Sequence, residues 1–223
     1  MKLSENTITI LKNFSTINNT ILVKPGNVLQ TMAIPSRAIF AKAFVEEEFP
    51  QQFAIYELST LIGALSIFDE PEIEFFEKHL TITSGRQQVR YTFAEPSMVV
   101  APPDKGVTMP EADVSFNLSS AEFTRLIRAA GVFKLPHITI TGDGSVVRIN
   151  AEDAKDPSKN TFGIDVGQTK HTFNMIIDVQ NIIRLLSRDY NVSMVSKGIC
   201  EFQADNLVYY VVCEHDSHFE KGE

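Results

Sequence analysis

The densest group of side chains able to bind a metal lies near the C-terminus, in the run Cys213-Glu-His215-Asp-Ser-His218. Thiol, imidazole and carboxylate groups are zinc ligands, but structural zinc sites combine two ligand pairs at characteristic spacings. No second cysteine pair accompanies this run. We therefore expect no metal site, and we interpret residues 215–223 as a solvated tail after a strand.

The chain contains two cysteines, Cys200 and Cys213, too few for a disulfide framework, which indicates a reducing compartment. If Asp205-Asn206 is a two-residue turn, Cys200 lies opposite Val211, and Cys213 is the diagonal neighbour of Cys200 on the same sheet face. Diagonal neighbours are about 7–8 Å apart, too far for an undistorted disulfide. We expect two buried thiols.

Residues that could support enzymatic chemistry are dispersed along the chain. His79, His137 and His171 belong to separate segments, and no phosphate-binding, zinc-protease or nucleophile-elbow motif is present. A small hydrolase or nuclease, one alternative for this chain, would need clustered carboxylates or histidines. We therefore expect a protein that is not an enzyme and that has no cofactor.

The charge distribution is more informative. The chain carries 20 basic and 28 acidic residues, yet the segments with helical periodicity are the only part with a basic excess. A cationic helix face suits the phosphates of nucleic acid, but Lys and Arg are also good helix formers on solvated faces, so composition leaves both interpretations open. A scaffold protein with no role on DNA would not need these cations. The candidate DNA-facing residues are Lys12, Arg125, Arg128, Arg184 and Arg188.

Residue spacing predicts the elements that position these cations. Apolar residues at i, i+3 and i+4 after polar caps predict helices over 4–18, 57–68, 119–134 and 178–188. Their starts are 53, 62 and 59 residues apart, which indicates a fourfold repeat of a strand, a helix and three further strands. The predicted strands are 21–24, 28–34, 37–45, 51–55, 73–76, 79–83, 87–93, 113–118, 137–141, 145–150, 161–166, 171–177, 191–196, 199–204 and 207–213.

Four prolines between residues 96 and 110 predict an extended connector over 96–112. The connector separates an N-terminal domain, 1–95, from a C-terminal domain, 113–223, each of ordinary domain size. No apolar run approaches the roughly 18 residues of a membrane span, and residues 1–6 are too polar for a signal peptide. We expect no membrane association.

The opening run Met-Lys-Leu-Ser-Glu-Asn-Thr-Ile-Thr-Ile-Leu-Lys-Asn-Phe-Ser-Thr-Ile-Asn, with Ile21-Leu-Val-Lys-Pro-Gly-Asn27 after it, resembles the start of the T4-type bacteriophage sliding clamps. These are DNA polymerase processivity factors. The resemblance implies an α+β DNA-clamp fold of two similar domains, each with two strand–helix–strands repeats, with antiparallel sheets outside and helices inside a homotrimeric ring. It places the candidate DNA-facing residues against encircled double-stranded DNA, where base readout would obstruct sliding.

The resemblance also implies partners: a DNA polymerase, an ATP-dependent clamp loader and phage late-transcription factors, in the cytoplasm of an infected bacterium. The apolar connector residues Met98, Val99, Val100 and Pro102 are then candidates for docking partner peptides, although simple packing on the strands beneath also explains them.

A head-to-tail ring needs two sheet edges whose backbone groups pair between subunits. By analogy with clamp architecture we expect these edges at 87–93 and 160–167. Val89 and Ile164 are the candidate interface residues at their centres.

Overall fold

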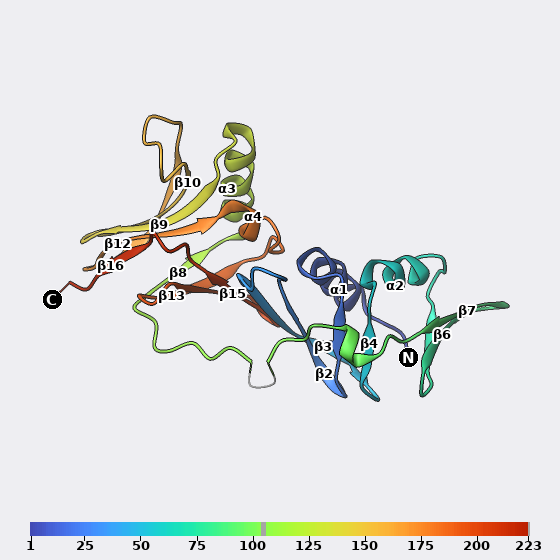
Figure 1. Cartoon of the computed structure of the whole chain (residues 1–223). Coiled ribbons are helices and arrows are strands. Elements are labelled where there is room, and N and C mark those ends of the chain that lie inside the picture. Colours follow the sequence, from blue (N-terminus) through green and yellow to red (C-terminus); the bar gives the residue numbers. More distant parts are fainter. Residues whose placement is uncertain (104–105, 223) are drawn as a thin grey trace. The chain divides into compact units, whose positions relative to one another are not determined.

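Figure 1 shows the computed structural model of the chain, which describes residues 1–103 and 106–222. The chain divides into two compact units, Met1–Gly106 (unit 1) and Val107–Glu223 (unit 2). Each unit has its own buried apolar core. Between the last strand of unit 1 and the first of unit 2, the predicted extended connector contains a short 3-10 helix, η1 (Pro96–Met98), which has proline in its first turn.

Unit 1 begins with a helix and alternates helices with antiparallel strands. β1 pairs with β4, β2 with β3, and β5, β6 and β7 form a sheet in that order. Its elements are α1 (Glu5–Ile17), β1 (Ile21–Val23), β2 (Gly26–Met32), β3 (Ile39–Phe49), β4 (Phe53–Ile55), α2 (Leu58–Leu65), β5 (Glu72–Phe75), β6 (His79–Ser84) and β7 (Gln87–Thr92).

Unit 2 contains one sheet in the order β11-β10-β9-β12-β16, and strands β8, β13, β14 and β15 pair in that order. All of these pairings are antiparallel. Its elements are β8 (Val114–Leu118), α3 (Ser120–Phe133), β9 (His137–Asp143), β10 (Val146–Glu152), β11 (Phe162–Gln168), β12 (Thr172–Asp178), α4 (Val179–Ile182), β13 (Tyr190–Val195), β14 (Ile199–Gln203), β15 (Leu207–Val212) and β16 (His218–Glu220).

The element order repeats one pattern four times. Each helix is followed by three strands, and each helix after the first is preceded by one strand: α1-β1-β2-β3, β4-α2-β5-β6-β7, β8-α3-β9-β10-β11 and β12-α4-β13-β14-β15. The predicted fourfold repeat and the α+β class are confirmed.

Local capping explains where the long helices begin. The Ser4 hydroxyl accepts a hydrogen bond from the Thr7 N–H at the start of α1. At the start of α3, Ser119 and Glu122 form a capping box, in which each side chain accepts from the other residue's backbone N–H. Both predicted helix starts are therefore confirmed.

The apolar faces of the long helices cover the sheets. α1 packs on β2 and β3, and α3 packs on β10 and β11. Ile10 and Phe14 of α1 and Leu126 of α3 are fully buried there. Helical spacing predicts Asn13 on the polar side of α1 and Phe133 on the apolar side of α3, and both predictions are wrong, because Asn13 is buried and Phe133 is exposed. Within the part of the chain that the structure describes, no helix has the length and apolar character needed to cross a membrane.

The predicted helix 178–188 is wrong beyond its first turn, because α4 ends at Ile182. The segment after it makes tertiary hydrogen bonds: the Leu186 N–H donates to the Tyr209 hydroxyl, and the Tyr190 hydroxyl donates to the Leu186 carbonyl. These bonds take the place of helical ones. Apolar spacing over 178–188 predicts that Ile183 is buried, but Ile183 is exposed.

The predicted solvated tail is also wrong in part. β16 pairs with the edge of β12, and Phe219 stacks on Phe173 with ring centroids 5.0 Å apart and planes at 4°. Lys221 Nζ lies 2.6 Å from Asp113 Oδ1. The hydrogen bonds from Lys221 and from the Ser196 N–H lower the pKa of Asp113 to about 2. Residues 218–221 are thus held on unit 2.

Candidate functional site

The polar face of α3 carries two of the candidate cations. Arg125 and Arg128 are exposed and three residues apart, which places them on neighbouring positions of one helix face. The opposite face, with Phe123 and Leu126, is buried. Hydrogen bonds from Ser119 lower the pKa of Glu122, so its negative charge stays at the positive N-terminal end of the helix. α3 therefore presents a cationic polar surface beyond its first turn.

Arg184 and Arg188 do not share a helix face, because both follow the end of α4. Both are half-buried and interact with neighbouring groups. The segment that contains Arg188 is attached to the first turn of α3: Ser187 Oγ lies 2.7 Å from Thr124 Oγ1, and Asp189 Oδ1 accepts a 2.7 Å hydrogen bond from the Ser120 N–H. These side-chain hydrogen bonds hold the segment beside the first turn of α3, in addition to the contact between α3 and α4.

Lys12 lies on the exposed side of α1 in unit 1. α2 packs beside α1 and has no charged residue between Leu58 and Leu65. The cations of the helical layers are therefore unevenly distributed, with one on α1 and two on α3.

The four candidate docking residues of the connector differ in exposure. Met98 and Val100 are 56% and 49% exposed, whereas Val99 is only 8% exposed. Pro102 is half-buried. The turn is fixed by hydrogen bonds from the Met98 N–H to the Glu95 carbonyl and from the Val99 N–H to the Pro96 carbonyl. The single apolar run therefore contains one anchoring residue between two accessible ones.

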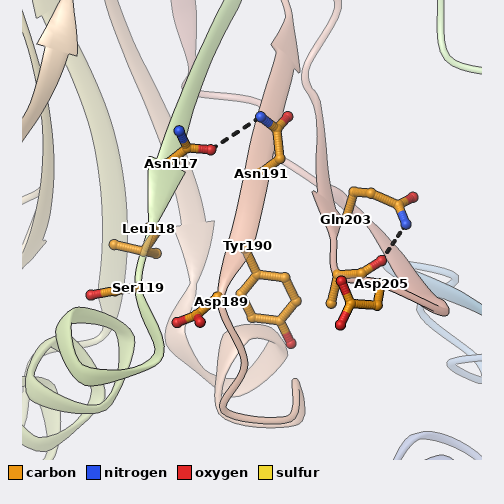
Figure 2. Close-up of a pocket in the computed structure, with 9 residues that line it drawn as sticks. Asn117, Leu118, Ser119, Asp189, Tyr190, Asn191, Gln203 and Asp205 are labelled. Atoms are coloured by element: carbon orange, nitrogen blue, oxygen red, sulfur yellow. Dashed lines mark hydrogen bonds between the residues drawn. The ribbon is translucent and has the colours of Figure 1, made fainter.

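Sequence reasoning missed an open groove of about 580 Å³ in unit 2. Figure 2 shows Asn117, Asn191 and Gln203, which line it from neighbouring strands, and Asp189 and Asp205 lower in the view. Asn191 Nδ2 donates a 3.2 Å hydrogen bond to Asn117 Oδ1. The strand register could have indicated this groove, because the three amide side chains occupy outward-facing positions of paired strands.

The groove offers hydrogen-bonding groups and no constellation suited to catalysis. Burial raises the pKa of the Tyr190 phenol, so this hydroxyl stays protonated. Across residues 1–103 and 106–222, no group of three or more histidine, cysteine, aspartate or glutamate side chains could hold a metal ion.

Both strands predicted at subunit edges lie at sheet edges within their own units. β7 is the last strand of β5-β6-β7, and β11 is the first of β11-β10-β9-β12-β16. Val89 lies on β7 and Ile164 on β11.

Similar proteins identify the family and the fold of this chain. Residues 2–101 match the family described as DNA polymerase processivity factor. The chain is 32% identical to the sliding clamp of Vibrio phage KVP40 over 96% of this chain and 99% of the relative. It is 30% identical to the sliding clamp of Enterobacteria phage T4, over 97% of this chain and 98% of the relative.

Solved structures with a similar fold are clamps with much lower sequence identity. A. fulgidus PCNA bound to the C-terminal region of FEN-1 has a TM-score of 0.72 at 12% identity, covering 97% of this chain and 98% of that one. The DNA polymerase III subunit beta of Pseudomonas aeruginosa has a TM-score of 0.62 at 14% identity, covering 94% of this chain and 62% of that one. The DNA-clamp fold is thereby established.

Proposed function

The chain belongs to the sliding-clamp family of DNA polymerase processivity factors, and from that premise we infer how it holds DNA and closes its ring. It is a non-enzymatic clamp that works with DNA and a DNA polymerase in a multimeric ring. This family assignment leaves the hydrolase, nuclease and scaffold alternatives without support.

The DNA-facing surface consists of Lys12, Arg125, Arg128, Arg184 and Arg188. The observation that carries this assignment is the exposed cationic face of α3 in a chain of net charge −8. A ring retains DNA by topology, so a few salt-screened contacts to phosphate suffice. Acidic surfaces elsewhere discourage adhesion to other DNA.

Ring closure uses the edges of β7 and β11, with three copies arranged head to tail. The support is that both strands end their sheets, so each leaves one row of backbone donors and acceptors without a strand neighbour in its own sheet. Pairing β7 of one copy with β11 of the next would satisfy both rows and close a homotrimer. Val89 and Ile164 lie within this interface.

Partner peptides dock at the connector through Met98 and Val100, with Pro102 beside them, while Val99 anchors the turn. The support is the contrast in burial between Val99 and its two neighbours. The partners are the polymerase, an ATP-dependent clamp loader and phage late-transcription factors, in the cytoplasm of the infected host. The loader supplies the ATP chemistry, since the chain has no nucleotide-binding motif.

The decisive experiment reverses the charge of α3. Arg125→Glu with Arg128→Glu should abolish processive synthesis by the cognate polymerase, because a like-charged surface repels the duplex. The matched control is Lys155→Glu with Lys197→Glu, the same charge change at two exposed loop lysines of unit 2. The control should match the wild type at every salt concentration.

The dependence of processivity on salt and on DNA sequence distinguishes a loss of phosphate contacts from a general loss of activity. The defect of the α3 variant should be the same on templates of different sequence, because phosphate contacts do not read bases. In the wild type, retention on duplex should weaken as salt rises from about 50 to 200 mM. Normal processivity of the α3 variant at low salt would show that α3 does not face DNA.

A further inference from the structure

Two thiols meet inside unit 2. Cys200 lies on β14 and is fully buried, and Cys213, the first residue after β15, is 9% exposed. Their Sγ atoms are 3.6 Å apart, and both thiols are free. No other role described for the chain uses this pair.

The strand register explains the contact. Cys200 lies opposite Val211, as the sequence predicts, and the Cys213 N–H donates to the Gly198 carbonyl at 2.8 Å. The cysteines are therefore diagonal neighbours on one inward face of the β14–β15 hairpin. The predicted separation was that of an average diagonal, but here the two side chains converge until their sulfurs touch. A disulfide needs an S–S distance of about 2.05 Å, so the two sulfurs must approach by roughly a further 1.5 Å.

We propose that Cys200 and Cys213 form an oxidative modification site, at which hydrogen peroxide converts the two thiols into an intrachain disulfide between β14 and the end of β15. The Cys213 thiolate attacks one peroxide oxygen, giving a sulfenic acid and hydroxide, which takes up the proton that the thiol released. The Cys200 sulfur then displaces the sulfenic hydroxyl. The S–S bond forms, the S–O bond breaks, and the Cys200 proton leaves in water. Two thiols and one peroxide give one disulfide and two waters.

The order of these steps follows from the environment of each sulfur. Cys213 is next to the strand end, and Gly198 beside it contributes no side chain, whereas Cys200 is enclosed. The contact with Cys213 and burial raise the pKa of the Cys200 thiol, which makes it a poor first target for peroxide. The reaction is therefore slow, with Cys213 attacked first and Cys200 resolving it.

The crosslink would change the energetics of the hairpin. It closes a short loop through the β14–β15 turn, which restricts the unfolded chain more than the folded one. Oxidised protein should therefore unfold at a temperature several degrees higher, and a dithiol reductant should reverse the shift.

The test treats the full-length protein with graded hydrogen peroxide, alkylates remaining thiols and measures the intact mass. The expected result is loss of two hydrogen atoms with both thiols lost together, in a species that runs as a single chain on a non-reducing gel. Cys213→Ser should leave Cys200 nearly unreactive, whereas Cys200→Ser should leave Cys213 to accumulate sulfenic and sulfinic acid.

Two results would overturn the proposal. One is wild-type protein that gains oxygen atoms at Cys213 while Cys200 stays alkylatable. The other is a disulfide that links two chains and none within a chain. Because both readouts use wild-type protein, they hold even where a serine variant is unstable, and neither depends on the proposed DNA interface.

Discussion

The carboxylate of Glu47, on β3, accepts a 2.5 Å hydrogen bond from the hydroxyl of Thr7, in the first turn of α1. The same carboxylate accepts from the Ser4 N–H at the helix N-terminus. The acidic run Glu46-Glu-Glu48 is typical of a solvated loop or of a patch that docks a partner. In the structure it lies within β3. Glu47 is thus a capping group supplied to α1 from another element.

Replacing Glu47 with Gln should lower the free energy of unfolding by about 1 kcal/mol, because a charged cap at a helix N-terminus is exchanged for a neutral one. Glu46→Gln, at an exposed position of the same strand, is the control and should have almost no effect. Denaturant titration of the three proteins measures the difference. Equal stability of all three would exclude the capping role.

The pKa of Glu47 determines how the difference in unfolding free energy between wild type and Glu47→Gln depends on pH. Burial raises the pKa of Glu47, but the hydrogen bonds from Thr7 and Ser4 outweigh burial and leave the pKa below its usual value of 4.5. The stabilisation is complete well above pH 4.5 and is lost as the pH falls through the lower folded pKa. The gap between wild type and Glu47→Gln should therefore narrow in acid.

Local signals account for the parts of the fold that sequence predicted well. Ser119 and Glu122 cap α3 within one turn, and alternation defines most strands, so these elements can be read from neighbouring residues. The end of α4 could not be read in this way, because Tyr190 and Tyr209 bind Leu186 from strands that follow it. A helix-compatible sequence loses its helix there to tertiary hydrogen bonds.

In the candidate site, too, some residues could be placed from local sequence patterns and others only from tertiary contacts. Exposure of Arg125 and Arg128 follows from helical periodicity alone. The surroundings of Arg188 and the amides of the groove depend on contacts between residues far apart in sequence. Three-residue β16 has too short a pattern to predict, since its stability comes from Phe173 and Asp113, more than forty residues away.

Charge reversal should change thermal stability differently on α3 and at Arg188. Arg125→Glu with Arg128→Glu should leave the melting temperature nearly unchanged, since exposed charges contribute little to stability. Arg188→Glu should lower it measurably, because Arg188 is half-buried close to Tyr190 and Tyr209. Thermal unfolding followed by circular dichroism compares them. A stable Arg188→Glu variant would indicate that this side chain is freely solvated.

Variants of the connector should distinguish residues that dock a partner from a residue that packs in the core. Met98→Asp with Val100→Asp should abolish stimulation of the polymerase while the melting temperature stays within a degree or two, because both side chains are exposed. Val99→Ala should instead lower the free energy of unfolding by about 1–2 kcal/mol with stimulation retained. Full stimulation by the double aspartate variant would place the docking surface elsewhere.

The hairpin register identifies the better position for a proline at the β7 edge. In a hairpin with the two-residue turn Gly85-Arg86, the flanking pair Ser84 and Gln87 is hydrogen-bonded, and hydrogen-bonded pairs alternate along the ladder. Val89 therefore directs its N–H to β6, whereas Arg90 directs its N–H to the open edge.

Arg90→Pro should shift the mass measured by light scattering from trimer towards monomer with the β6–β7 ladder intact. Val89→Pro should also destabilise unit 1, because it removes a hydrogen bond within the sheet. A trimer that survives Arg90→Pro at micromolar concentration would argue against β7 as the closing edge.

Phe219 should hold the last strand on unit 2. Its ring stacks on Phe173 and lies 5.4 Å from the His171 ring, and the Gly222 N–H donates to His171 Nδ1. Phe219→Ala should cost about 1–2 kcal/mol, because a half-buried aromatic face and its stacking partner are both lost. Hydrogen exchange should accelerate at residues 172–174, the part of β12 that pairs with β16. Glu220→Ala, at the exposed neighbour, should leave exchange unchanged, and equal protection in both variants would mean that backbone pairing alone retains β16.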